Sequence, residues 1–203
     1  MALVENCHDG IFQMLRVHAN VVDTMANREN HYEAAFEAYL RERRIPYVAV
    51  DEAKRSRWAE GTIKSLDFIV SPPDRPSWLV DVKGRRFPSG DQKQYWKNWS
   101  TRDDLVSLSR WERLFGEQFG GLFVFAYNIV GDRAPLPRER LFAFRGNLYG
   151  FVGITLDKYA LHARPISPKW DTLAMPSAAF RRLASPIERF FIEVHAEQEA
   201  LAP

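Results

Sequence analysis

The sequence predicts an α/β domain: a helix, three short strands, a second helix and a buried strand follow in that order, with extra strands and a helix at the C-terminal end. Two observations predict this class. Apolar residues recur at helical spacing in two segments, and the runs between and after these segments are short and rich in β-branched and aromatic residues. A chain of 203 residues, 46% hydrophobic and 27% charged, suits a soluble globular protein with one core.

We expect three regions along the chain. Residues 1–29 have mixed polarity and no clear helix cap, which indicates an N-terminal arm, and residues 30–160 form the core domain. Residues 161–203 form a C-terminal extension that is interrupted by prolines and ends in a docking helix, with Ser185 as N-cap and Pro186 in the first turn. That helix would pack through Ile187, Phe190, Phe191 and Val194.

The first predicted helix begins near Asn30. Its apolar residues recur three or four positions apart, as on one face of an amphipathic helix, and comprise Tyr32, Ala35, Phe36, Tyr39 and Leu40. Four charged residues follow, and Pro46 prevents the helix from continuing.

Three strands are expected next, at residues 47–50, 65–70 and 78–82, because each run is rich in β-branched or aromatic residues. The link between the last two, residues 71–77, contains three prolines, which favour a turn and cannot join a hydrogen-bonded ladder. These two strands are therefore predicted to form a hairpin.

A second helix is expected to begin at Thr101, where Asp104 three residues later completes a capping box. Residues 122–130 are almost continuously apolar, which is typical of a strand covered on both faces. Residues 141–144 and 149–156 predict a later pair of strands.

Several kinds of protein are excluded. The one cysteine, Cys7, cannot form an internal disulfide, and no apolar run is long enough for a signal peptide or a membrane helix, so we expect a cytoplasmic protein without a membrane partner. The five histidines are isolated, which argues against a zinc site, and the phosphate-binding, dinucleotide-binding and serine-hydrolase motifs are absent.

The side chains most suited to catalysis lie on the predicted hairpin. In its second strand the period of two places Asp81 and Lys83 on one face, and the first strand contributes a lone acid, Asp67. Asp67 and Asp81 lie seven residues on either side of Asp74, so a symmetric hairpin places them opposite or diagonal to each other. Two carboxylates this close repel each other unless a metal ion or a proton lies between them.

The Asp/Glu-x-Lys pattern occurs three times, so its context decides its meaning. Residues 52–54 follow the first strand, but no earlier strand supplies a partner carboxylate, and residues 91–93 lie in a polar stretch. Only residues 81–83 end an apolar strand that has an acid on the preceding strand.

With this order of elements, the chain resembles the PD-(D/E)XK nuclease superfamily and its restriction-endonuclease-like core, in particular its resolvase-like members. Asp67 takes the place of the first motif aspartate, Asp81 and Lys83 take the (D/E)XK positions, and Leu66 replaces the leading proline. In many members an acid on the first helix completes the site, and Glu33 matches it here. The resemblance covers about residues 30 to 130.

The resemblance implies metal-assisted phosphodiester hydrolysis. Asp67 and Asp81, with Glu33 directly or through water and the Val82 carbonyl, would hold Mg²⁺, with Mn²⁺ as a substitute. The metal ion would act as a Lewis acid and lower the pKa of a bound water. Lys83 would orient or deprotonate that water, or stabilise negative charge in the transition state.

Two less specific interpretations stay open at this stage. On a helical wheel Glu33 borders the apolar stripe whereas Glu37 points further into solvent, but Glu33 also occupies the third position of a helix capped by Asn30. Asp67 and Lys83 would equally suit a buried ion pair that supports the hairpin.

The segment after the motif is basic and aromatic. Residues 83–102 contain six cations and one anion, a local charge of +5, whereas the whole chain sums to only +2. Cations contact phosphates and aromatic rings stack on bases, so we expect nucleic-acid contacts here. The expected contacts are Arg85, Arg86, Lys93, Trp96, Lys97, Trp99 and Arg102. The alternative is that the aromatic residues belong to the core and the cations to a solvated rim.

The sequence thus favours a Mg²⁺-dependent DNA endonuclease, in which cutting at two positions would favour a homodimer. The alternatives are a non-catalytic nucleic-acid-binding module on the same scaffold and a structural or protein-binding domain.

Overall fold

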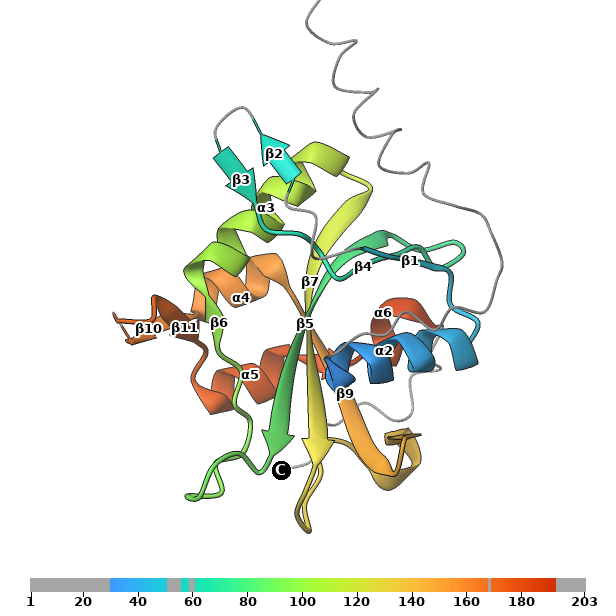
Figure 1. The fold of residues 1–203 in the computed structure, drawn as a ribbon, viewed down its shortest axis with the longest axis vertical. Helices are drawn as coiled ribbons and strands as arrows, with labels where there is room; N and C mark the ends of the chain where they lie inside the picture. The colour runs from blue at the N-terminus through green and yellow to red at the C-terminus, as the bar shows by residue number, and fades with distance from the viewer. Residues whose placement is uncertain (1–29, 51–55, 59–60, 168, 193–203) are drawn as a thin grey trace, which may run out of the picture.

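The computed structural model describes residues 30–50, 56–58, 61–167 and 169–192. Its centre is a seven-stranded mixed sheet in the strand order β1-β4-β5-β7-β9-β12, with β8 paired to β9 (Figure 1). Residues 1–29, predicted as an arm, and Val194 of the predicted docking helix lie outside the described part of the chain. The division at residue 160 stays a prediction, and helix α4 (Leu156–His162) runs across it.

The elements of the predicted core occur in the predicted order. Three strands form an antiparallel meander after the first helix, and a further strand returns parallel to the third after the second helix. The side chains of Asn30 and Thr101 cap the two helices as the sequence predicts. The elements are α2 (His31–Glu42), β1 (Tyr47–Ala49), β4 (Phe68–Val70), β5 (Ser77–Phe87), α3 (Arg102–Phe115) and β7 (Phe119–Ile129).

Shorter elements complete the fold. A small hairpin separates β1 from β4, and β6 joins β10 and β11 in a second sheet. Within the described residues, no helix has both the length and the apolar composition needed to cross a bilayer. These elements are β2 (Ser56–Trp58), β3 (Gly61–Ile63), β6 (Ser100–Thr101), η1 (Arg138–Arg140), β8 (Phe142–Phe144), β9 (Asn147–Thr155), β10 (Arg164–Ser167), β11 (Thr172–Ala174), α5 (Ser177–Leu183), β12 (Ser185–Pro186) and α6 (Glu188–Phe191).

The C-terminal docking helix differs from its prediction. Ser185 and Pro186 form the edge strand β12, paired with Gly153 and Val152 of β9, and helix α6 begins only at Glu188. A proline is tolerated in an edge strand because its missing N–H can face away from the ladder. The capping pattern was therefore overridden by pairing with the sheet.

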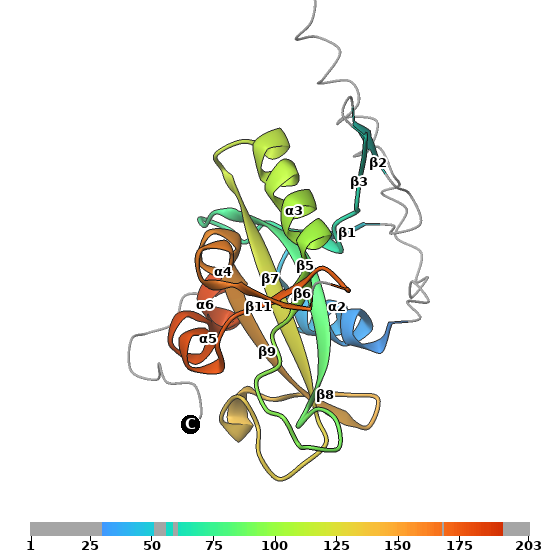
Figure 2. The ribbon, with the colours of Figure 1, turned by 90° about the vertical axis from the view of Figure 1, so that its left-hand side faces the viewer.

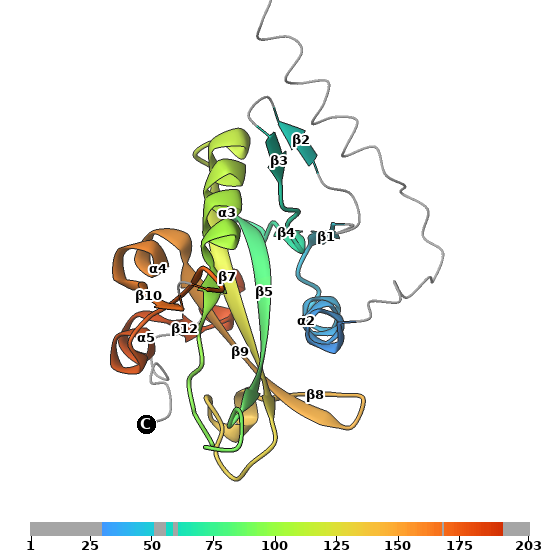
Figure 3. The same ribbon diagram turned by 60° about the vertical axis from the view of Figure 1, so that its left-hand side comes forward.

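The sheet separates two layers of helices. Figures 2 and 3 show β5 and β7 with α2 on one side and α3, α4 and α5 on the other. Val80 and Val82 pack in one apolar cluster with Phe36 and Leu40 of α2, together with other buried residues. Leu79 packs in a second cluster with Leu108 and Trp111 of α3. Because side chains alternate along a strand, Asp81 and Lys83 project to the α3 side with Leu79.

Strand β5 is longer than predicted. The sequence ended it at Val82, but the structure continues it to Phe87, in parallel register with β7 from Ser77↔Phe119 to Phe87↔Ile129. Residues 84–86 are polar or lack a side chain, so periodicity did not reveal them as strand; the long apolar partner β7 keeps them in the sheet. The extension places Arg85 on the same face as Lys83.

The close approach of α2 to β5 at Gly84 gives a first prediction. A Cβ atom at Gly84 would overlap the ring of Tyr32 on α2, so this position requires glycine. We expect Gly84→Ala to lower the free energy of unfolding by about 1–3 kcal/mol, as overpacking usually does. Urea unfolding of Gly84→Ala, Tyr32→Ala and the double variant tests it. The two changes should be strongly non-additive because removing the ring removes the clash, and additive losses would contradict this explanation.

Candidate functional site

The hairpin has the predicted register. Phe68 pairs with Val80 and Ile69 pairs with Leu79. The same register, continued by one residue, places Asp67 opposite Asp81. Strand β4 begins only at Phe68, so Asp67 lies just before it. The backbone N–H of Val82 donates a hydrogen bond to Oδ2 of the Asp67 side chain at 2.5 Å. The Asp67 carboxylate therefore lies against the peptide bond that joins Asp81 to Val82.

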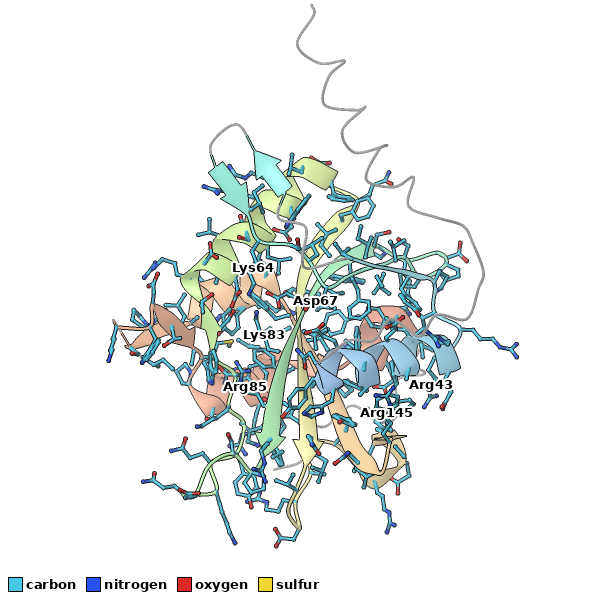
Figure 4. The ribbon with its side chains drawn as sticks, viewed as in Figure 1. Arg43, Lys64, Asp67, Lys83, Arg85 and Arg145 are labelled. Atoms are coloured by element: carbon cyan, nitrogen blue, oxygen red, sulfur yellow. The ribbon has the colours of Figure 1, made fainter. Side chains whose placement is uncertain are left out.

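Lys83 is the centre of a buried group of charges. Its Nζ lies 2.7 Å from Oδ1 of Asp81 and 2.9 Å from Oδ2 of Asp104, and its side chain is only 10% exposed. A second lysine, Lys64, places its Nζ 2.5 Å from Oδ1 of Asp104. We call Lys64, Asp81, Lys83 and Asp104 the lysine–aspartate cluster. Figure 4 shows Lys64, Lys83 and Arg85 on the side of β5 that carries α3 and β6.

Asp104 is fixed by the start of α3. Its Oδ2 accepts hydrogen bonds from the Ser100 hydroxyl (3.0 Å) and the Thr101 N–H (2.9 Å), while its own N–H donates to the Thr101 hydroxyl (3.1 Å). The capping box is as predicted, but the pairing of its acid with two lysines was not predicted from the sequence. That second role depends on α3 packing over β5, which local spacing does not encode.

The charges shift one another's pKa values. Burial raises the pKa of Asp81, the Lys83 ammonium opposes this, and the Asp104 carboxylate adds to it. Burial alone would lower the pKa of Lys83, but the carboxylates of Asp81 and Asp104 outweigh it and hold the pKa above its usual range. Lys83 therefore stays protonated near neutral pH, where it can donate hydrogen bonds and offset negative charge but cannot accept a proton.

Glu33 lies on the helix that packs against the other face of the sheet. Its Oε1 accepts a hydrogen bond from the side chain of Asn30, whose Oδ1 caps the N–H of Tyr32. The structure therefore places Glu33 in the cap of α2, as the less specific interpretation held, and its role as a metal ligand stays a prediction. Glu37 is buried rather than solvent-directed: it accepts from the Tyr47 hydroxyl at 3.0 Å and from Arg41 at 3.2 Å.

Two predicted nucleic-acid contacts belong to the interior. Trp96 is 5% exposed and packs edge-on against Phe87 and Tyr127, so its assignment as a base-stacking residue is corrected: it is a core residue. Arg85 is buried, donates to the carbonyls of Gly84 (2.6 Å) and Trp99, and stacks 3.8 Å from the centre of the Trp99 ring. Burial lowers the pKa of this guanidinium. Arg85 thus acts within the protein, by fixing the segment before α3.

The other predicted contacts lie nearer the surface. Arg86, Lys93 and Trp99 are exposed, and Lys97 is partly buried. Arg102 is exposed and pairs through Nε with Oδ1 of Asp171 at 3.0 Å. Their contact with nucleic acid stays a prediction.

The donor set suits a Mg²⁺ ion in its chemistry. Within the ranges that the structure describes, no three acidic, histidine or cysteine side chains converge on one point. Mg²⁺ does not require three, because it commonly binds through one or two carboxylates and fills the other positions with water and substrate phosphate. Asp67 and Asp81 supply two carboxylates beside one peptide of β5.

Comparisons with known proteins give little beyond this geometry. No family model and no curated protein matches the chain. Among solved structures, the chain is similar to Hjc of Archaeoglobus fulgidus, a Holliday junction resolvase from an archaeal hyperthermophile, at 15% identity and a TM-score of 0.35. The likeness covers 59% of this chain and 84% of that one. A likeness of this size does not assign the chain to a family.

The cluster predicts how stability depends on pH. Lys83, Lys64 and the Thr101 N–H outweigh the effect of burial and hold the pKa of Asp104 below its usual range. A carboxylate with a depressed folded-state pKa contributes stability that is complete above its unfolded pKa of about 3.9 and is lost as pH falls towards the folded value. We expect Asp104→Asn to cost about 3–5 kcal/mol at pH 6, since it breaks a buried pair, and clearly less at pH 3.

Urea unfolding at both pH values measures the difference between Asp104→Asn and wild type. Asp103→Asn is the matched control, because Asp103 is the exposed acid in the same first turn of the helix. An equal loss at pH 3 and pH 6 would show that Asp104 does not contribute through its charge.

Proposed function

We propose that this protein has a restriction-endonuclease-like core and is a metal-dependent nuclease that hydrolyses phosphodiester bonds in DNA by a PD-(D/E)XK mechanism. One observation carries the proposal: the Asp67 carboxylate lies against the peptide of Asp81, whose own carboxylate contacts Lys83 at 2.7 Å. The order of helix, antiparallel meander, helix and parallel strand around these residues supports it.

Each residue of the site has a role in this proposal. Asp67 and Asp81, with the Val82 carbonyl, would hold Mg²⁺ or Mn²⁺ through hard oxygen ligands. When bound, the metal ion supplies Lewis-acid chemistry and lowers the pKa of a coordinated water. Glu33 remains a predicted further ligand, directly or through water; its helix packs on the other face of the sheet, and its Oε1 accepts from Asn30.

Lys83 would act as a cation. The carboxylates of Asp81 and Asp104 raise its pKa in the free protein, and its ammonium can donate to a non-bridging phosphate oxygen and stabilise the charge that develops there. Asp104 and Lys64 position it, because Asp104 holds Nζ at 2.9 Å and is itself held by Lys64.

Exposed cations would hold the DNA backbone near this site. Lys93 and Lys97 follow in the segment that leads to α3, whereas Arg86 projects from the α2 side of β5. These side chains can contact phosphates in any sequence, so binding should weaken as salt concentration rises. A homodimer would allow two strands to be cut, and it belongs to the same proposal.

A second candidate is a DNA-binding module without catalysis. It is favoured by the charge balance of the lysine–aspartate cluster, in which two ammonium groups offset two carboxylates. Such a group can stabilise the junction of β5 and α3 without any reaction.

Cleavage assays distinguish the two candidates. Wild type, Asp81→Asn and Lys83→Met are incubated with plasmid and with branched DNA, in Mg²⁺, in Mn²⁺ and in a chelator. We expect metal-dependent cutting by wild type and a loss of about 10²–10³-fold in rate for each variant, the size typical of removing one charge-stabilising group. Lys158→Ala is the control: it removes an exposed lysine on α4 that does not belong to the lysine–aspartate cluster, and it should keep most of the rate.

Thermal unfolding of every variant ensures that lost activity is not lost folding. Calorimetric titration with Mn²⁺ adds a direct reading of metal binding, which Asp67→Asn and Asp81→Asn should abolish. Wild type that binds DNA but neither cuts it nor binds Mn²⁺ would refute the nuclease and leave the binding module.

A further inference from the structure

An aromatic pocket lies beside the lysine–aspartate cluster. Its volume is about 880 Å³, within the range of about 300–1,000 Å³ that ligand pockets usually have. Residues 94–99 and Thr101 form one wall, and the other is formed by Ile166, Trp170, Thr172, Ala174, Met175 and Ser177. Trp99 (37% exposed), Trp170 (69%) and Ile166 (57%) present large apolar surfaces here to solvent.

One tryptophan of the pocket is held rigidly. The Arg85 guanidinium stacks 3.8 Å from the ring centre of Trp99 and donates to its carbonyl. One face of the indole is therefore covered by a cation, which fixes the plane of the ring. A fixed aromatic plane at the edge of a pocket is a platform for stacking another flat ring.

Two polar side chains of the pocket are engaged within the protein. Asn98 donates to the carbonyls of Trp96 and Met175 (3.1 Å each) and accepts from the Met175 N–H at 2.8 Å. The Thr101 hydroxyl accepts from Asp104. These two side chains are therefore committed to the fold, and the exposed tryptophans offer stacking surfaces for a ligand.

The charge of the pocket favours an anionic ligand. Lys97 is the one charged residue that lines it in the described part of the chain, and no acid does. Lys169 lies 5.4 Å from the ring centre of Trp170 at the same rim. A nucleotide has an aromatic base and a negatively charged phosphate, so it matches this combination of aromatic rings and lysines.

The wall of the pocket is joined directly to the proposed catalytic residues. Ser100 and Thr101 follow Trp99 and donate to the same Asp104 oxygen that contacts Lys83. β5 contributes Lys83 to the cluster and, two residues later, Arg85, which stacks on Trp99 of the pocket wall. The wall of the pocket and the proposed catalytic lysine therefore share Asp104 as a common partner.

We propose that this pocket binds an unpaired base of a DNA strand, and that the protein acts on DNA containing unpaired or extruded nucleotides. A paired base cannot enter, because both its faces are covered by the duplex stack. The inference deepens the proposed function and rests on it for the identity of the ligand, but binding can be measured without cleavage.

Fluorescence anisotropy tests the proposal in a chelator with full-length protein. The probes are a duplex, the same duplex with one bulged nucleotide, and the same bulge lacking its base. We expect wild type to bind the bulged base about tenfold more tightly than the baseless bulge, the scale of one base stacked on an aromatic side chain. Trp170→Ala should remove this difference, whereas Leu161→Ala, which truncates an equally exposed residue outside the pocket, should retain it.

Each outcome decides the proposal separately from cleavage. Equal affinity of wild type for the bulged base and the baseless bulge would overturn the proposal. A Trp170→Ala variant that loses the same factor in affinity for both probes would overturn it too. Lys83→Met should keep the preference for the bulged base while losing cleavage. If wild type cuts no DNA yet prefers the bulged base, the nuclease proposal fails and the base pocket stands.

Discussion

The ion pairs of Lys83 connect the three segments on which the site depends. Its ammonium lies between Asp81 on β5 and Asp104 at the start of α3, and Asp104 in turn holds Lys64, which precedes β4. Burying such charges is expensive, and apolar residues of the same size would commonly stabilise a protein as well or better. The arrangement is therefore better explained by a need for a fixed, protonated amine at this position than by stability alone.

Strand β5 determines where that amine can act. Its parallel pairing with β7 along eleven residues fixes which side chains face α3, and the alternation places Asp81, Lys83 and Arg85 in one row. Val80 and Val82 face α2 and are buried among its apolar residues. The charged row is thus supported from behind by a packed core, and the same strand that places Lys83 also fixes Trp99 through Arg85.

The sequence predicted what local periodicity can encode. The order of core elements, the hairpin register around Asp74 and the capping box of α3 follow from spacing within a few residues, and all three are present. The composition of residues 83–102 predicted surface contacts less well, because some basic and aromatic residues of this segment lie at the surface and others in the core. Trp96 and Arg85 are interior because β5 continues to Phe87 and brings their segment over Tyr127, which only the pairing with β7 determines.

The charge balance of the lysine–aspartate cluster affects how metal and DNA would bind under the proposed function. The lysine–aspartate cluster is neutral, so a divalent ion placed beside Asp67 and Asp81 meets the opposing field of Lys83, whose Nζ already lies 2.7 Å from Asp81. A phosphate brings negative charge that both cations can share, since Mg²⁺ takes phosphate oxygens readily and Lys83 has ammonium protons to donate. Under the proposed function, metal and DNA therefore favour each other's binding, and Lys83 exchanges part of its contact with Asp81 for the substrate. The ion pair between Lys83 and Asp81 on β5 would then restrain metal binding until a phosphate is present.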